Sequence, residues 1–419
     1  MKKSFKESRL EVKTILKKAE NLIKSKNFKK AVEELEKYKS SIRNVDFYLL
    51  LAEAYEGLGN KEKAETYFEE ARFLDTELRS KEKLKRGVSF VASKNFRAAE
   101  KELLESVRLN PFEKDAYLEL YRLYREMSNY KGMVRALENL ITIDPYSVFP
   151  YLELSRIHGI RRQFKKAEQV LISGISVVDS PELHFELGKL YADMGKLEEA
   201  KEELSKACRM DFKNIEYRQK LAEVMVNNEE YEDALKVVMS TLELYPEAVY
   251  VIQSAAALYD LLGKEEIAEY YYRLAISKSE GFVKEDAKKL FVEFLIEKGK
   301  FDQAEEILKE LIESTDNVWI LIDSFSELAI LLIDQERFRD IAELGSFVLK
   351  NPELSEEEYC EIAEIVADAL FEEGDYEEAI EYYREIINYS KDEKLIKRAY
   401  NKLKEVEEIE SLERMLKLS

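Results

Sequence analysis

An alanine returns at a nearly constant interval along this chain, and a large apolar residue follows it four positions later in almost every case. We call these positions anchors; Met133 and Ile341 stand in place of the alanine at two of them, and successive anchors lie 33 to 38 residues apart. The anchors are Ala31, Ala64, Ala99, Met133, Ala167, Ala200, Ala234, Ala268, Ala304, Ile341 and Ala379. A period in this range is typical of repeat proteins, whose units bury a core only against their neighbours. The sequence therefore predicts one elongated stack of units without a sharp domain boundary.

The segment 181–210 illustrates how one unit is built. Apolar residues recur every three or four positions over 183–191 and again over 197–207, which is the spacing of amphipathic helices. Gly195 lies between the two stretches, where a helix can end with positive φ. Each unit is thus predicted to be a hairpin of two helices. An aromatic residue opens the second helix in most units, namely Phe28, Phe96, Tyr130, Phe164, Tyr231, Phe301, Phe338 and Tyr376.

This pattern resembles the tetratricopeptide repeat. In one unit the matching residues are His184, Leu187, Gly188, Tyr191, Ala200, Leu204 and Ala207, with His184 at the position where the family usually has Trp. In another they are Tyr48, Leu51, Ala52, Tyr55, Ala64, Phe68 and Ala71. The resemblance implies an all-α fold, an α-solenoid of about eleven antiparallel helical hairpins in a right-handed superhelix whose first helices line the concave side. It also implies protein or peptide binding rather than catalysis.

The repeats are expected to occupy residues 12–393. They are predicted to start near residues 12, 45, 80, 114, 148, 181, 215, 249, 285, 322 and 360, after a basic N-terminal lead-in at 1–11. Residues 394–419 have helical spacing without a second-helix anchor, so they are predicted to form a C-terminal capping helix, because a solenoid needs its last open face covered. The same helix offers an alternative, pairing with another chain, which leaves monomer and homodimer both open.

The net charge of −20 is unevenly distributed. Residues 300–419 carry 14 Lys and Arg against 33 Asp and Glu, whereas residues 1–50 carry 14 against 7. An acidic total disfavours nucleic acid, whose phosphates need a basic face, and it permits basic protein partners. No stretch predicts a secretory leader or a membrane span. The two cysteines lack metal-type spacing and fit a reducing compartment, so a soluble cytoplasmic protein is expected.

Sequence motifs of catalysis are not found. The chain has no Gly-rich phosphate loop and no nucleophile or zinc signature, and its many carboxylates cannot be separated from solvated helix faces. His158 and His184 occupy positions where the repeat pattern has aromatic residues, so both are expected to serve packing. The sequence therefore predicts no catalytic residue, no metal site and no cofactor.

One charge pattern recurs on three successive first helices. An acid precedes a base by three residues in the pairs Glu119 and Arg122, Glu153 and Arg156, and Glu186 and Lys189. Residues three apart on a helix are neighbours, so these could be self-neutralising surface pairs worth roughly 0.2–0.5 kcal/mol each. The functional interpretation is a charged track for an extended peptide, with the bases meeting carboxylates and the acids meeting basic side chains.

The corresponding part of a later repeat is much less charged. Tyr250, Gln253, Ser254 and Ala257 lie there, and they predict a patch that receives an apolar side chain. Together these features favour a non-catalytic scaffold that binds a peptide segment or protein partner in its concave groove. The alternative is a structural protein that self-assembles through its C-terminal helix or through the ends of the solenoid.

Overall fold

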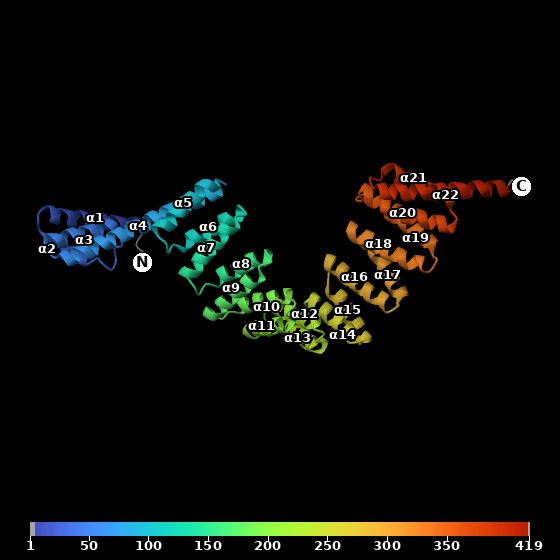
Figure 1. Cartoon of the computed structure of the whole chain (residues 1–419), viewed down its shortest axis with the longest axis horizontal. Helices are drawn as coiled ribbons and strands as arrows, with labels where there is room; N and C mark the ends of the chain where they lie inside the picture. Colours follow the sequence, from blue (N-terminus) through green and yellow to red (C-terminus); the bar gives the residue numbers. More distant parts are fainter. Residues whose placement is uncertain (1–4, 418–419) are drawn as a thin grey trace. The chain divides into compact units, whose positions relative to one another are not determined.

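The computed structural model describes the backbone of residues 5–417 and the side chains of residues 12–409. Within 5–417 the regular structure is entirely helical (Figure 1), as the repeat pattern predicts. The helices form two compact units, residues 1–212 and 213–419, whereas the sequence predicts one stack without a sharp boundary. Each repeat depends chiefly on its immediate neighbours, so a regular sequence period does not by itself show where a chain of this kind divides.

The first unit contains the helices of the first six repeats. They are α1 (Phe5–Lys24), α2 (Phe28–Glu36), α3 (Val45–Gly57), α4 (Lys61–Ala92), α5 (Phe96–Leu109), α6 (Lys114–Glu126), α7 (Tyr130–Ile143), α8 (Val148–Ile160), α9 (Phe164–Val177), α10 (Pro181–Asp193) and α11 (Leu197–Met210). Each first helix packs against the second helix that follows it, and first helices of successive repeats, such as α8 and α10, also touch. The first helices therefore form a shared face within this unit.

The second unit repeats the same order. Its helices are α12 (Ile215–Asn227), α13 (Tyr231–Leu244), α14 (Val249–Leu261), α15 (Glu265–Lys278), α16 (Gly281–Glu297), α17 (Phe301–Ser314), α18 (Val318–Ile333), α19 (Phe338–Val348), α20 (Glu356–Glu373), α21 (Tyr376–Tyr389) and α22 (Glu393–Lys417). Here α12, α14, α16, α18 and α20 are the first helices. No helix in 5–417 is both long enough and apolar enough to cross a bilayer.

The anchors lie at the helix crossings that the period predicts. All eleven are buried, with at most 7% of their surface exposed. In the sixth repeat, Gly188 of α10 faces Ala200 and Leu204 of α11 so closely that a Cβ atom at position 188 would lie 2.6 Å from Leu204 Cγ. Small residues are needed at this crossing because the two helices approach each other closely.

The turn inside each hairpin has the same backbone conformation in all eleven cases. The residue five positions before each anchor has positive φ, which reverses the chain after the first helix. These residues are Lys26, Gly59, Lys94, Ser128, Arg162, Gly195, Glu229, Gly263, Gly299, Glu336 and Gly374. Glycine adopts this conformation without strain, whereas in other L-residues it costs roughly 1–2 kcal/mol.

We therefore expect Arg162→Gly to stabilise the protein. Arg162 has φ of 54°, and removing its Cβ relieves strain, although glycine also gains freedom in the unfolded chain. The expected net gain is about 0.5 kcal/mol. Urea denaturation followed by circular dichroism measures it. Gln169→Gly, an exposed change inside α9, is the control and should cost about 1 kcal/mol; a loss of stability in Arg162→Gly would contradict the argument.

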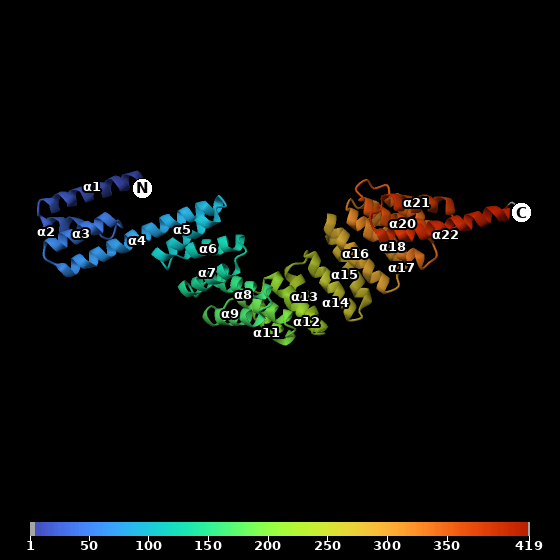
Figure 2. The same ribbon diagram turned by 45° about the horizontal axis from the view of Figure 1, so that its top comes forward.

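Helix α4 departs from the regular hairpin pattern. The sequence predicts a new repeat starting near residue 80, but the helix continues unbroken from Lys61 to Ala92 (Figure 2). No Pro or Gly lies between 72 and 86, so nothing in the local sequence ends the helix. Ser80 is instead fully buried, and its hydroxyl donates to the carbonyl of Ser106 at 3.0 Å. One helix thus serves as the second helix of one repeat and the first helix of the next.

The C-terminal helix covers the end of the second unit, as predicted. Leu395, Ala399 and Val406 of α22 are buried in the core that they share with α20 and α21, and Arg398 forms an ion pair with Glu364 of α20 at 2.6 Å. The side chains beyond residue 409 lie outside the described residues. So do residues 1–4 of the predicted lead-in, and α1 begins inside that lead-in at Phe5.

Candidate functional site

The first helices carry a common set of side chains that the core does not use. Positions i, i+4, i+7 and i+11 lie on one face of a helix, and we call these four positions the first-helix stripe. On the last three first helices of the first unit it comprises Asp115, Glu119, Arg122 and Glu126 on α6, Phe149, Glu153, Arg156 and Ile160 on α8, and Glu182, Glu186, Lys189 and Asp193 on α10. The three predicted acid–base pairs are its middle members.

Each predicted pair forms an ion pair within its own helix. The distances are 2.5 Å for Glu119 with Arg122, 3.0 Å for Glu153 with Arg156 and 2.9 Å for Glu186 with Lys189. The acid side chains are only 16–26% exposed, whereas the basic side chains are 38–61% exposed. The carboxylates of these pairs are therefore largely satisfied by their neighbours, and within each pair the base is the more exposed member.

Tyr121 links two of these helices and was not identified as a site residue. It is buried on α6, and its hydroxyl donates to the carboxylate of Glu153 on α8. Burial, together with this hydrogen bond, raises the pKa of Tyr121 to about 12, so the hydroxyl keeps its proton and remains a donor. Phe149 packs edge-on against the Tyr121 ring at 5.8 Å. Tyr121 thus holds Glu153 in place across the joint between two repeats.

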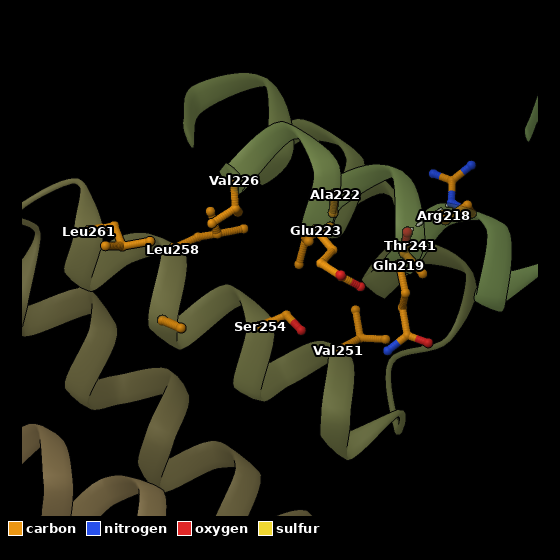
Figure 3. Close-up of a pocket in the computed structure, with 12 residues that line it drawn as sticks. Arg218, Gln219, Ala222, Glu223, Val226, Thr241, Val251, Ser254, Leu258 and Leu261 are labelled. Carbon is orange, nitrogen blue, oxygen red and sulfur yellow. Dashed lines mark hydrogen bonds between the residues drawn. The ribbon is translucent and has the colours of Figure 1, made fainter. Parts of the chain in front are cut away.

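The second unit contains an open pocket on its first-helix face. It has a volume of about 340 Å³ and lies between α12 and α14, over α13 (Figure 3). Most of its wall is apolar, formed by Ala222, Val226, Val238, Val251, Ala257, Leu258 and Leu261. Figure 3 shows Leu258, Leu261 and Val226 toward one end and Arg218 and Gln219 toward the other. A pocket of this size and lining suits one bulky apolar side chain.

Polar groups surround the apolar wall. The Arg218 guanidinium donates to the hydroxyl of Thr241 at 2.8 Å and to that of Ser240, so it is fixed at its end of the pocket. Glu223 is paired with Lys220 at 2.6 Å. The Gln219 amide and the Ser254 hydroxyl border the opening between these ends. Such groups can hydrogen-bond the backbone of a bound segment while its side chain occupies the wall.

The predicted patch on α14 contributes to this pocket in part. Ser254 and Ala257 line it, whereas Tyr250 and Gln253 do not. Tyr250 is 43% exposed one turn before Ser254, and the Ser254 hydroxyl donates to the Tyr250 carbonyl at 2.9 Å. The α12 side of the pocket, including Ala222 and Val226, was not anticipated. Its sequence signal is Val226, an apolar residue where the corresponding positions of α6 and α14 hold the charged residues Arg125 and Asp260.

The two histidines make polar contacts in addition to the packing that is expected of them. His184 is buried, but its ring nitrogens lie 2.7 Å from an Asp179 oxygen and 2.5 Å from a Glu203 oxygen. It therefore ties the start of α10 to α11 through polar contacts. His158 is half-buried and its Nδ1 lies 2.9 Å from Gln163 Oε1. Among the described residues, no group of three or more His, Cys, Asp and Glu side chains could hold a metal ion.

Comparison with known proteins gives one family match. A family model described as tetratricopeptide repeat matches residues 45–71, 181–214 and 349–393. No curated protein sequence matches the chain significantly.

Similar solved structures share low identity with this chain. MamA is 20% identical and has a TM-score of 0.36, with 39% of this chain and 91% of that one covered. YrrB, described as a tetratricopeptide repeat protein with an unusual peptide-binding site, is 15% identical, with a TM-score of 0.37 and 45% and 97% covered. A tetratricopeptide repeat protein from Parabacteroides merdae is 15% identical, with a TM-score of 0.40 and 61% and 99% covered.

Proposed function

Starting from the fact that this chain is a tetratricopeptide repeat protein, we propose that it is a non-catalytic scaffold that binds a peptide segment of a protein partner on its first-helix face. The observation that carries the proposal is the apolar pocket between α12 and α14. Burying a Leu or Phe side chain there contributes roughly 1.5–3 kcal/mol. Anchoring one bulky side chain in a pocket is a common source of affinity in protein–protein recognition.

The first unit supplies a second, charged contact in this proposal. Arg122, Arg156 and Lys189 project from successive first helices into solvent, and they meet carboxylates of a bound segment. Glu119, Glu153 and Glu186 hold these bases and are open to basic side chains only at their exposed edges. We therefore expect the charged track predicted from the sequence to bind its partner chiefly through Arg122, Arg156 and Lys189, which we call the basic row.

Other parts of the proposal follow from charge and cysteine chemistry. Nucleic acid is not the expected partner of a chain with net charge −20, because phosphates require a basic surface. Neither Cys208 nor Cys360 is part of a disulfide, which fits a reducing compartment, and we place the scaffold in the cytoplasm. The alternative of self-assembly through α22 or the solenoid ends predicts a mass in solution above that of one 49.1 kDa chain; a monomeric mass contradicts it.

Peptide selection against the full chain tests the pocket. We expect peptides selected from a random library to share a bulky apolar residue, and Ser254→Trp to weaken their binding by at least about tenfold because the new side chain fills the pocket. Ser277→Trp is the matched control. Ser277 is exposed on the second helix α15 and its hydroxyl also bonds a carbonyl of the preceding turn, that of Leu274. Equal binding to both variants would falsify the pocket assignment.

A separate set of peptides rich in Asp and Glu tests the basic row independently of the pocket. Arg122→Glu combined with Arg156→Glu should weaken their binding, and the loss should shrink as salt is added, since exposed charges are screened. Circular dichroism establishes that the double variant is folded. Unchanged binding of acidic peptides removes the basic row from the binding site.

A further inference from the structure

The first-helix stripe continues through the second unit with a different composition. On α14 it comprises Tyr250, Ser254, Ala257 and Leu261, of which the last three line the pocket. On the next two first helices one stripe position holds an exposed aliphatic side chain, Leu290 on α16 and Ile330 on α18, with 39% and 61% of their surfaces exposed. An apolar pocket followed by exposed aliphatic residues on one helix face is typical of an interaction surface.

Carboxylates occupy the other stripe positions of α16, α18 and α20. They are Asp286, Glu293 and Glu297 on α16, Asp323 and Glu327 on α18 with Asp334 at its C-cap, and Glu361, Asp368 and Glu372 on α20. The remaining member on α20 is Ile365. Thus three successive helices each show three acids, one aliphatic residue and no base on the stripe, and α18 and α20 contain no Lys or Arg at all.

Three of these nine carboxylates are engaged by neighbouring groups. Asp323 and Glu327 both lie 2.7 Å from the ammonium of Lys289 on α16, and Asp368 accepts a hydrogen bond from Tyr383. The six others are exposed, and none of them forms an ion pair within residues 12–409. They are Asp286, Glu293, Glu297, Asp334, Glu361 and Glu372.

The stripe on α6, α8 and α10 shows the contrast. There each middle Glu has a base three residues later on the same helix, so each of these helices carries a cation on the stripe, whereas α16, α18 and α20 carry none. Like charges on neighbouring helix positions are destabilising unless a cation approaches them. The unbalanced carboxylates of α16, α18 and α20 therefore favour a cationic occupant, and they disfavour phosphorylated or acidic segments and nucleic acids.

We infer that the first-helix face from α14 to α20 binds a protein segment in which Lys or Arg residues alternate with aliphatic ones, and whose bulky apolar residue occupies the pocket between α12 and α14. The inference rests on the proposed function and specifies its partner. The aliphatic residues of the segment contact Leu290 and Ile330, and its cations lie among the six free carboxylates. Pairing of complementary charges gives this surface its specificity and speeds association.

Three synthetic peptides probe this surface on the full chain by fluorescence anisotropy. The first has one Trp followed by alternating Lys and Leu, the second has Glu in place of every Lys, and the third has Gln in place of the Trp. We expect the first to bind with an affinity that falls as salt rises, the second not to bind, and the third to bind more weakly. Equal binding of the Lys and Glu peptides overturns the inference.

Charge reversal locates the contact. Glu293→Lys combined with Asp334→Lys should weaken binding of the Lys peptide by at least about tenfold. The matched control is Glu306→Lys with Glu378→Lys, which makes the same change in net charge at exposed positions of the second helices α17 and α21. Equal losses in the two double variants show attraction to net charge alone and overturn the inference.

The pocket variant separates this inference from the proposed function. In one outcome, the selected apolar peptides lose affinity with Ser254→Trp, but the Lys peptide binds no better than the Glu peptide. This result would support the scaffold function and show that the cationic specificity is wrong. Selected peptides unaffected by Ser254→Trp would instead contradict the function proposed for the pocket.

Discussion

Gly345→Leu is expected to lower the free energy of unfolding by about 3 kcal/mol, even though most other repeats have a large residue at this position. A Cβ atom on Gly345 would lie 2.2 Å from Val366 Cγ2 and 3.0 Å from Phe325 Cζ. Val366 and Phe325 are fully buried, and the branched Val side chain has little rotameric freedom. A larger side chain at position 345 therefore forces α19 and α20 apart.

The reason is that the large and the small side chain of this repeat have changed places between two neighbouring core positions. This repeat has Ile341 where the others mostly have alanine, and Gly345 where they mostly have a large residue. Both face the same core one helical turn apart. Ile341→Ala should cost about 3 kcal/mol, because it leaves a cavity at a fully buried site. In the double variant the leucine can occupy part of that cavity, so the combined loss should be at least about 1 kcal/mol smaller than the sum.

The fluorescence of Trp319 reports on this part of the chain. It is the only tryptophan and lies on α18, directly before α19. Repeat proteins need not unfold in one step, so a local probe during urea denaturation is preferable to a global one, and circular dichroism provides the comparison. Strictly additive losses, or a gain from Gly345→Leu, would show that the two positions do not exchange volume.

Tyr383→Ala is expected to cost about 4 kcal/mol. The Tyr383 side chain on α21 is fully buried, and its hydroxyl donates to Asp368 Oδ1 of α20 at 2.5 Å. The alanine variant therefore loses the packing of an aromatic ring and the hydrogen bond together. Tyr383→Phe keeps the ring and removes only the donor, so its smaller loss, about 1–3 kcal/mol, measures the cost of leaving Asp368 without this partner.

The loss in Tyr383→Phe should depend on pH in a defined direction. Burial raises the pKa of Asp368 above its ordinary value, and the Tyr383 hydrogen bond and Lys402 of α22 partly oppose the rise. The folded protein thus binds the Asp368 proton more tightly than the unfolded chain does, so this group's contribution to stability falls as pH rises through its raised pKa. Removing the hydroxyl strengthens the effect, and the loss should be larger at pH 7 than at pH 4.

Asp368→Asn provides the control for this pH dependence. The amide has no charge to bury, so the variant should be more stable than the parent at pH 7, and the advantage should disappear below the ordinary pKa range of aspartate. Trp319 fluorescence and circular dichroism at several pH values measure both variants. A loss in Tyr383→Phe that stays constant across this range would mean that the Asp368 charge does not contribute to it.

The repeat architecture could be predicted because the residues that form the helix crossing within each hairpin recur at a regular interval in the sequence. Every hairpin needs a small residue where its helices cross, or a larger one with a small residue beside it, and every anchor is buried in the structure. The aromatic residues that were expected to open second helices do so, from Phe28 of α2 to Tyr376 of α21. The unbroken helix α4 could not be predicted from the period, because the period marks contacts between helices and not the points where a helix ends.

The candidate site was predicted less completely. Ser254 and Ala257 were expected at a site for an apolar side chain and line the pocket, but Ala222 and Val226 on the facing helix complete its wall. Residues on separate helices become neighbours only through the packing of successive repeats. Similarly, the pairing of Glu119 with Arg122 follows from helical spacing, whereas the contact of Glu153 with Tyr121 of the preceding repeat does not.

The sequence by itself determined the all-α hairpin repeat, the positions of its close crossings and the face on which charges recur, because these depend on spacing along single helices. Tertiary structure decided which of those side chains stay exposed, which carboxylates already have a partner, and where two first helices leave a pocket between them. Those properties depend on the distances between helices, and a residue period does not encode such distances.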